Sequence, residues 1–155
     1  MNQMRLNRRG TLLVIAASFV VTRPVWASTR PLSIAVYKDP SCGCCGAWAE
    51  RLKSAGFQVD VIESRDLARV KATHAIPDDL VSCHTGIVKG FAMEGHVPPA
   101  DILRFLKSKR NSLGLAVPGM PLGSPGMEME DSRIEAYTVW EFFPGGSRTA
   151  FSQHK

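Results

Sequence analysis

Three of the four cysteines of this chain lie in one short segment, Cys42 to Cys45, with the sequence Cys-Gly-Cys-Cys. The segment follows residues 32–37, whose alternating apolar and β-branched side chains predict a strand. It precedes residues 46–55, where apolar side chains recur at helical spacing and Gly56 can end the helix. The thiols are therefore expected at a helix N-terminus, where free N–H groups and the helix dipole favour the thiolate.

Strand and helix patterns then alternate along the chain. The second helix is expected to be capped by Ser64 and to bury Leu67, Val70 and His74. The expected elements are strands at 32–37, 57–62, 85–88 and 91–93 and helices at 46–55, 65–74 and 98–107. This β-α-β-α-β-β-α order is that of a thioredoxin-like α/β fold.

The C-terminal part departs from that order. Residues 111–131 contain many glycines and prolines, so no regular structure is expected there, and a loop of this length is often functional. Residues 135–143 and 147–152, joined by a Pro-Gly-Gly turn, predict a closing β-hairpin. The expected fold is thus thioredoxin-like, with a Gly/Pro/Met-rich loop and a β-hairpin as its C-terminal extension.

Residues 1–27 have the pattern of a bacterial signal peptide, with a basic start, an apolar run of about ten residues and Ala27 before the expected cleavage site. The apolar run is shorter than the ~20 residues that span a bilayer, which argues against the alternative of a retained membrane anchor. Arg8 and Arg9 also fit a twin-arginine leader, so the export route stays open. Residues 28–155 are expected to form a single periplasmic domain without a membrane span, in a compartment where thiols usually become disulfides.

The basic character of the chain belongs mostly to that leader. The formal net charge is +5, and residues 1–27 hold four arginines and no acidic residue. The remaining chain is close to neutral, so a nucleic-acid partner is not expected.

The number and spacing of the thiols restrict their chemistry. Cys42 and Cys45 form a C-x-x-C pair where a redox enzyme keeps one, but a dithiol enzyme needs only two sulfurs. Cys44 and Cys45 are adjacent, so their side chains are expected to diverge and to meet poorly on one tetrahedral zinc ion. Such thiolates suit bridging between several soft ions, among which Cu(I) is the best match. Cys83, entering the third strand, is the expected fourth sulfur.

Two structural alternatives remain for these cysteines. They can form a disulfide that only stabilises an exported domain, and Cys83 can be a small buried apolar residue. From another functional class, a thiol–disulfide oxidoreductase that uses Cys42 and Cys45 is the main alternative to a copper protein.

Further soft ligands lie outside the cysteine segments. Met120 and Met127 carry thioethers, which bind Cu(I) without losing a proton, although packing of their loop against the domain explains them equally well. His84 directly follows Cys83 and is a candidate ligand. His96 lies in a turn that can face the same edge of the domain as the loop.

Four separated segments resemble the CopG-type copper-resistance proteins. In chain order they are Cys42–Gly46, Ser82–Thr85, Glu94–Pro98 and Gly114–Pro121 with Gly126–Glu128. The resemblance covers nearly all of residues 32–151 and includes the export signal. It implies a thioredoxin-like periplasmic protein that binds several Cu(I) ions in a cysteine-bridged cluster, with other periplasmic copper-resistance proteins as potential partners. A redox role toward copper has been proposed for such proteins.

The sequence therefore predicts a periplasmic Cu(I)-binding protein that sequesters, relays or converts copper. No Ser-His-Asp set, phosphate-binding loop or pair of carboxylates predicts another chemistry. The predicted metal ligands, four of which the resemblance makes cluster thiolates, are Cys42, Cys44, Cys45, Cys83, Met120, Met127 and His84.

Overall fold

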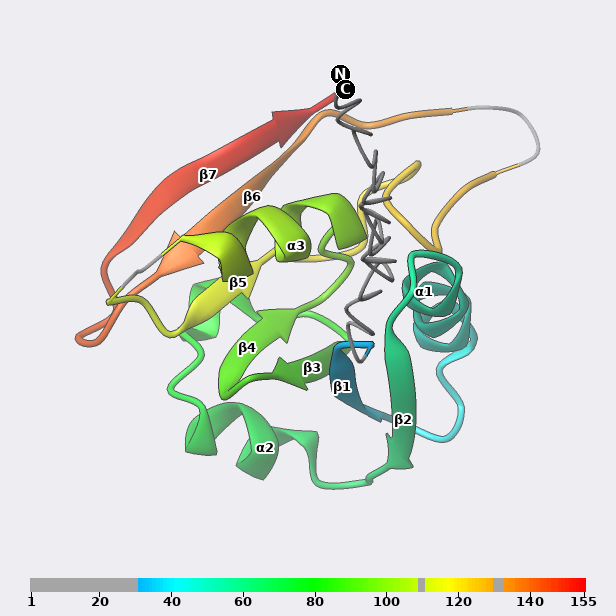
Figure 1. Cartoon of the computed structure of the whole chain (residues 1–155), viewed down its shortest axis with the longest axis horizontal. Helices are drawn as coiled ribbons and strands as arrows, with labels where there is room; N and C mark the ends of the chain where they lie inside the picture. Colours follow the sequence, from blue (N-terminus) through cyan, green and yellow to red (C-terminus); the bar gives the residue numbers. More distant parts are fainter. Residues whose placement is uncertain (1–30, 109–110, 130–132) are drawn as a thin grey trace, which may run out of the picture.

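The structure is a computed structural model that describes residues 31–155 apart from 109–110 and 130–132. The predicted signal peptide, residues 1–27, lies outside the described residues. Seven strands form one mixed sheet in the order β2-β1-β3-β4-β5-β6-β7 (Figure 1). Their bounds are β1 Ser33–Lys38, β2 Gln58–Glu63, β3 His84–Val88, β4 Phe91–Glu94, β5 Gly114–Ala116, β6 Tyr137–Phe142 and β7 Arg148–His154.

Among the described residues, three α-helices and one short 3-10 helix connect the strands. They are α1 Gly43–Ser54, α2 Leu67–Thr73, η1 Asp78–Leu80 and α3 Pro99–Lys107. Apart from η1, the elements from β1 to α3 follow the predicted order, with β1 parallel to β2 and antiparallel to β3. The predicted α/β class is confirmed, and the likeness to thioredoxin stays a prediction from that order. Within the described chain, no helix is long and apolar enough to cross a membrane.

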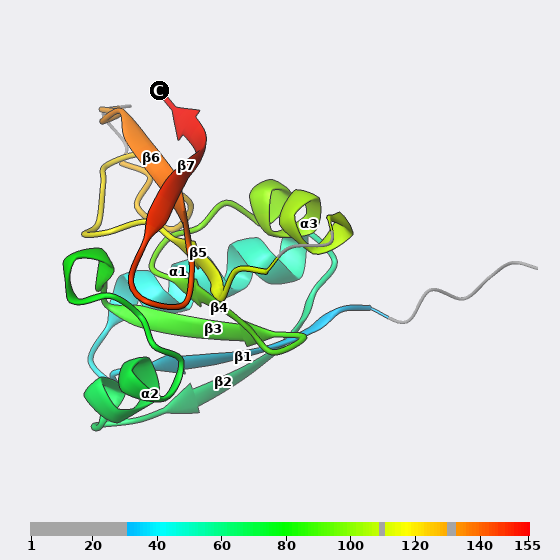
Figure 2. The ribbon, with the colours of Figure 1, turned by 90° about the vertical axis from the view of Figure 1, so that its left-hand side faces the viewer.

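Two apolar cores lie on opposite faces of the sheet because successive side chains of a strand point to opposite sides. On one face, Met93 of β4 belongs to a core with Trp48 of α1 and Phe105 of α3. On the other face, the preceding residue Ala92 joins a smaller core with Leu80 of η1. Figure 2 shows this division, with α1 and α3 on one side of β1 and β3 and α2 on the other.

Helix α2 is shorter than predicted and is capped by a different residue. It begins at Leu67, and the Asp66 carboxylate accepts the backbone N–H of Arg69 at 3.1 Å. Ser64, the predicted cap, instead accepts the backbone N–H of Asp66. The buried residue of the helix is Lys71, whereas the three residues of the predicted apolar face are half-buried. Lys71 is buried because its ammonium group meets a buried carboxylate of β4.

The prediction that residues 111–131 lack regular structure is wrong at one end. Gly114–Ala116 form β5, which is buried between β4 and β6. Gly114 fits inside this strand because a Cβ at its position would lie 1.8 Å from the carbonyl oxygen of Ala92, so the close approach of β4 requires a glycine. The predicted hairpin follows as β6 and β7, which pair in antiparallel fashion.

Candidate metal centre

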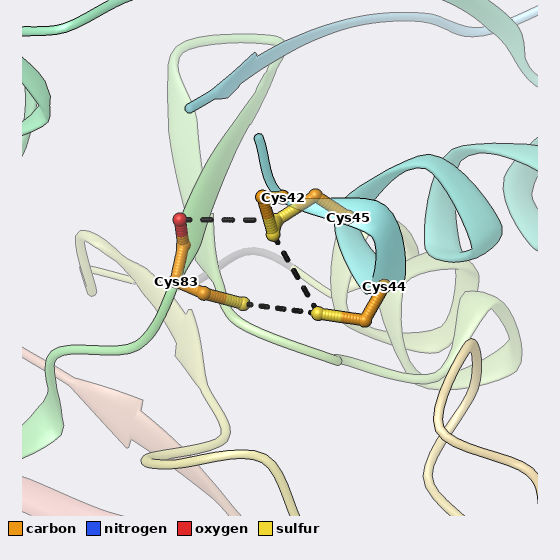
Figure 3. A group of neighbouring side chains, drawn as sticks. All are labelled: Cys42, Cys44, Cys45 and Cys83. Atoms are coloured by element: carbon orange, nitrogen blue, oxygen red, sulfur yellow. Dashed lines mark hydrogen bonds between the residues drawn. A yellow bond between two sulfur atoms is a disulfide. The ribbon is translucent and has the colours of Figure 1, made fainter. Parts of the chain in front are cut away.

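All four cysteine sulfurs meet at the N-terminus of α1 (Figure 3). The helix begins at Gly43, earlier than predicted, so Cys44 and Cys45 lie in its first turn and Cys42 is its N-cap residue. Cys83 approaches from the segment just before β3. The four Sγ atoms lie within 4.8 Å of one another.

Two of these sulfurs are joined to each other. Cys42 and Cys45 form a disulfide, whereas Cys44 and Cys83 are free. Cys44 Sγ lies 3.5 Å from Cys42 Sγ and 4.0 Å from Cys83 Sγ. Cys44 and Cys45 were expected to direct their sulfurs apart. Their Sγ atoms nevertheless lie within 4.8 Å of each other and of Cys83 Sγ, which is close enough for one ion to reach both. Once the disulfide is reduced, the four sulfurs form a group that could hold a metal ion.

Cys83 also has two imidazoles beside it. His84 Nδ1 lies 3.2 Å and His96 Nε2 lies 3.4 Å from Cys83 Sγ. Both histidines are fully buried, and together with Cys83 they form a second group of side chains that can hold a metal ion. Cys83 belongs to both groups, so its sulfur joins a sulfur side of the site to an imidazole side.

Hydrogen bonding gives His96 a free lone pair on the side of Cys83. His96 Nδ1 lies 2.9 Å from the carbonyl oxygen of Pro125, which can only accept, so Nδ1 carries the proton. Nε2 then directs its lone pair toward Cys83 and is able to bind a metal ion. Burial lowers the pKa of His96, which favours the neutral, metal-binding form of the ring.

His84 directs its other ring nitrogen, Nδ1, toward Cys83. Its Nε2 is buried and has no hydrogen-bond partner within the described residues. A buried N–H without a partner is rarer than a buried lone pair without one, so we place the proton on Nδ1, which then donates toward Cys83 Sγ. Burial lowers the pKa of His84 to about 3, and the ring packs 4.4 Å from that of Trp48. This geometry makes His84 a hydrogen-bond donor to the sulfur, and its role as a metal ligand stays a prediction.

The Cys83 thiol holds its proton tightly when no cation is near. Burial, followed by the neighbouring Cys44, raises the pKa of Cys83 to about 11. A bound cation reverses this preference because it stabilises the thiolate directly. Metal binding at Cys83 is therefore expected to release a proton.

Residues 117–129, which we call the Met loop, bring a thioether to the sulfur side of the site. Met120 Sδ lies 3.9 Å from Cys44 Sγ, and Met120 is 51% exposed. Met127 is half-buried, and no contact of hydrogen-bond length joins its sulfur to a cysteine of the described chain. Of the two predicted methionine ligands, the structure thus brings Met120 into contact with a thiol, whereas Met127 has no such contact within the described residues.

The Met loop rests directly on helix α1. A Cβ at Gly126 would lie 2.6 Å from the backbone nitrogen of Trp48, and Gly126 has a φ of +87°, so both the contact and the conformation require glycine. An ion pair of 2.8 Å between Arg51 of α1 and Glu128 adds a second link. The loop is therefore held over the middle of α1, the helix whose N-cap and first turn carry three of the cysteines.

One family model and two solved structures match this chain. A family model described as a protein of unknown function, DUF411, matches residues 80–127, which include Cys83, His84, His96 and most of the Met loop. Two solved structures described as copper resistance protein copG, form 2 and form 1, are 42% and 43% identical to the chain, each with a TM-score of 0.76. The alignments cover 81% and 80% of this chain and 99% and 98% of the solved chains. The chain belongs to the CopG family of copper-resistance proteins. None of the curated proteins matches it.

Membership in the CopG family confirms the resemblance inferred from the four segments, and the cysteine cluster can bind metal. The residue that the sequence prediction omitted is His96. Its signal was present, because His96 lies in Glu94–Pro98, one of the four CopG-like segments. Spacing along the chain did not indicate that this turn faces Cys83.

Proposed function

We propose that this protein is a periplasmic Cu(I)-binding protein of bacterial copper resistance, which holds copper in a cysteine-bridged cluster for sequestration, relay or redox conversion. The observation that carries the proposal is the pair of ligand groups that share one sulfur, Cys83. A shared thiolate can bridge two ions, one on the sulfur side and one on the imidazole side. Several ions per chain are therefore expected.

The donor set supports Cu(I) over the other common metals. The proposed thiolate ligands are Cys42, Cys44, Cys45 and Cys83, and thiolates together with thioethers select Cu(I). Zinc prefers cysteine, histidine and carboxylate ligands, so a thioether 3.9 Å from Cys44 Sγ favours the softer ion.

The methionines and histidines near the cysteines have different roles in this proposal. We place Met120 on the exposed side of the cluster and His96 on its buried side, for the geometric reasons given above. Met127 becomes a ligand only if the Met loop rearranges around copper. His84 supports Cys83 through a hydrogen bond from Nδ1, and with its proton there it takes a metal only through the buried Nε2.

The disulfide makes the number of copper ions depend on the redox state. Reduction of the bond between Cys42 and Cys45 takes two electrons and two protons from a dithiol, which itself becomes a disulfide. The two thiols released can then give up their protons to solvent as their sulfurs bind copper. Copper bound in this way protects them from reoxidation in an oxidising compartment.

Export and domain organisation belong to the same proposal. Residues 1–27 act as a bacterial signal peptide, with Arg8 and Arg9 fitting the twin-arginine route, and residues 28–155 form one domain with a thioredoxin-like first part. Export of the folded, copper-loaded protein would keep its thiols reduced. Potential partners are other periplasmic copper-resistance proteins.

A second candidate function is favoured by one observation. The disulfide between Cys42 and Cys45 lies at a helix N-terminus, which is the arrangement that a thiol–disulfide oxidoreductase uses. In that case copper binding is incidental and Cys83 is not needed for turnover.

The two candidates are separated by anaerobic titration of the reduced full-length protein with Cu(I), against a competing chelator, with free thiols counted at each point. We expect several copper ions per chain and all four thiols masked. Cys44→Ser and Cys83→Ser should each lose most of this binding, whereas Ser41→Ala, next to the cysteine segment, should not. Wild-type affinity in both cysteine variants would rule out the cluster. Reduction of insulin by the protein, surviving Cys83→Ser, would favour the oxidoreductase.

A further inference from the structure

A buried polar network lies beneath the segment that carries Cys83. The Glu94 carboxylate is fully buried and forms an ion pair with Lys71 of α2. Thr85 Oγ1 donates to Glu94 Oε2 at 2.6 Å and accepts from Lys71 Nζ at 3.1 Å. Buried charges persist when they are paired and hydrogen-bonded, so these three side chains form a satisfied and rigid group.

This network holds Ser82, the residue before Cys83. Glu94 Oε1 accepts the backbone N–H of Ser82 at 2.7 Å. Gly95 leaves room for Ser82, because a Cβ at Gly95 would lie 2.7 Å from both Cβ and Oγ of Ser82. The backbone of Ser82 is thus tied to a buried carboxylate, and its side chain has a defined direction.

The side chain of Ser82 points to the Met loop. Its hydroxyl group donates to the carbonyl oxygen of Gly119, the residue before Met120. Cys83 Sγ lies 3.9 Å from the same Oγ, but a carbonyl oxygen is the stronger acceptor for its single proton. One residue therefore joins the buried network, the backbone of Cys83 and the backbone beside Met120.

We propose that Ser82 is a positioning residue: its hydrogen bond to Gly119 places the Met120 thioether against Cys44. The thioether held in this place makes the site selective for soft monovalent metal ions. The inference rests on the proposed metal-binding function. Met120 is 51% exposed, so packing alone leaves it free to turn into solvent. The bond from Ser82 to Gly119 is a direct link between the Met loop backbone and the segment of Cys83.

The distinction between metals gives this proposal a sharp test. Cu(I) and Ag(I) accept a thioether, whereas Zn(II) is bound through thiolates and imidazoles. Loss of the Ser82 hydroxyl should therefore weaken Cu(I) and Ag(I) binding and leave Zn(II) binding unchanged. A general loosening of the site would instead weaken all three metals together.

The experiment compares Cu(I), Ag(I) and Zn(II) affinities of the reduced full-length protein with those of Ser82→Ala, Met120→Leu and the double variant. Loss of a residue that orients a ligand commonly costs about 10–100-fold in metal affinity. We expect each single variant to bind Cu(I) and Ag(I) about tenfold more weakly, and the double variant to be no weaker than Met120→Leu. Ser54→Ala is the matched control, because it removes a serine-to-carbonyl hydrogen bond of 2.9 Å at the far end of α1.

Four results would overturn the proposal. Unchanged Cu(I) affinity in Ser82→Ala shows that the bond does not matter, and an equal loss for Zn(II) shows that its role is only structural. Additive losses in the double variant show that Ser82 does not act through Met120. Failure of the unmodified protein to take up Cu(I) would overturn the proposed function itself, and this inference with it.

Discussion

The two sides of Cys83 are built in different ways. On the sulfur side, Cys44 is half-buried and Met120 is 51% exposed, and the covering Met loop rests on α1 through a glycine contact and an ion pair at the surface. On the imidazole side, His84 and His96 are both 0% exposed and come from β3 and from the turn between β4 and α3. The sulfur side is thus open to solvent at Cys44 and Met120, although Cys45 is buried, whereas the imidazole side is part of the core.

This difference in exposure suggests that the two sides of Cys83 have different roles. Exposed soft ligands can accept an ion from solution or from a partner, because an incoming donor reaches them. Buried imidazoles hold their geometry because the surrounding core leaves them no alternative position. The predictions below test whether the two sides behave independently, beginning with the largest expected effect.

Truncation of the side chain that supports the imidazole side should be the most damaging change. Trp48 is fully buried against His84, and its Nε1 donates to the carbonyl oxygen of Val97 at 2.9 Å. We expect Trp48→Ala to lower the free energy of unfolding of the apo protein by about 3–5 kcal/mol, measured by urea denaturation. On the sulfur side, Met120→Leu should change it by less than about 0.5 kcal/mol. Similar losses in the two variants would contradict the difference in rigidity.

The two imidazoles should differ in their effect on copper. His96 directs a lone pair toward Cys83, whereas His84 donates a proton to it. We expect His96→Gln to weaken Cu(I) binding by about 100-fold and His84→Gln by about tenfold, as for a residue that only orients a ligand. His74→Gln, on the half-buried end of α2, is the control. Cu(I) competition titrations check this order, and a larger loss in His84→Gln would reverse our assignment of the two protons.

The link between the Met loop and α1 should be weak. The side chains of Arg51 and Glu128 are 55% and 43% exposed, and surface ion pairs of this kind contribute about 0–1 kcal/mol. We expect Arg51→Gln to lower the free energy of unfolding by less than about 1 kcal/mol, and the loss to disappear at high salt, where the pair is screened. Lys53→Gln breaks a comparable exposed pair with Glu50 and is the matched control. A larger loss that persists in salt would mean that the loop is held as firmly as the imidazole side.

The last effect, which is absent at neutral pH, concerns a tyrosine whose surroundings include the Met loop. Burial, followed by the charges of Asp101 and Glu128, raises the pKa of Tyr137 to about 12. The folded protein holds this proton more tightly than the unfolded chain, whose tyrosines have a pKa near 10. Stability should therefore be unaffected below about pH 10 and should decline as the pH rises from 10 toward 12.

Tyr137→Phe should remove part of that alkaline decline, as measured by unfolding at several pH values, and Glu128→Gln should lower the pKa of Tyr137 in a spectroscopic titration. An unchanged pKa in Glu128→Gln would show that the Met loop does not lie close to Tyr137 in solution. A decline of equal size in Tyr137→Phe would assign it to other groups.

Much of the fold follows from patterns that are local in the chain. Strand patterns predicted both ends of β1, β2, β3 and β4 to within one residue, and helical spacing with a flanking glycine predicted α1. The cysteine segment lies at the start of α1 because an apolar strand, a turn and an amphipathic helix follow one another in sequence. Four thiols, a C-x-x-C pair and the CopG-like segments could be identified without any structure.

Other features depend on contacts between distant residues. Strand β5 exists because β4 and β6 supply hydrogen-bond partners on both sides, a context that glycine and proline content does not reveal. Local propensity is overridden wherever such partners are available.

For the site, the sequence by itself determined which side chains have the chemistry to bind a soft metal. Only the tertiary structure decided that Cys83 stands between sulfurs and imidazoles, that His96 faces it, and that Met120 reaches Cys44 while Met127 does not. The physical reason is that periodicity specifies which face of an element is buried, but not which loop will close over which strand end. That choice is made by the packing of whole elements against each other, here by the Met loop on α1.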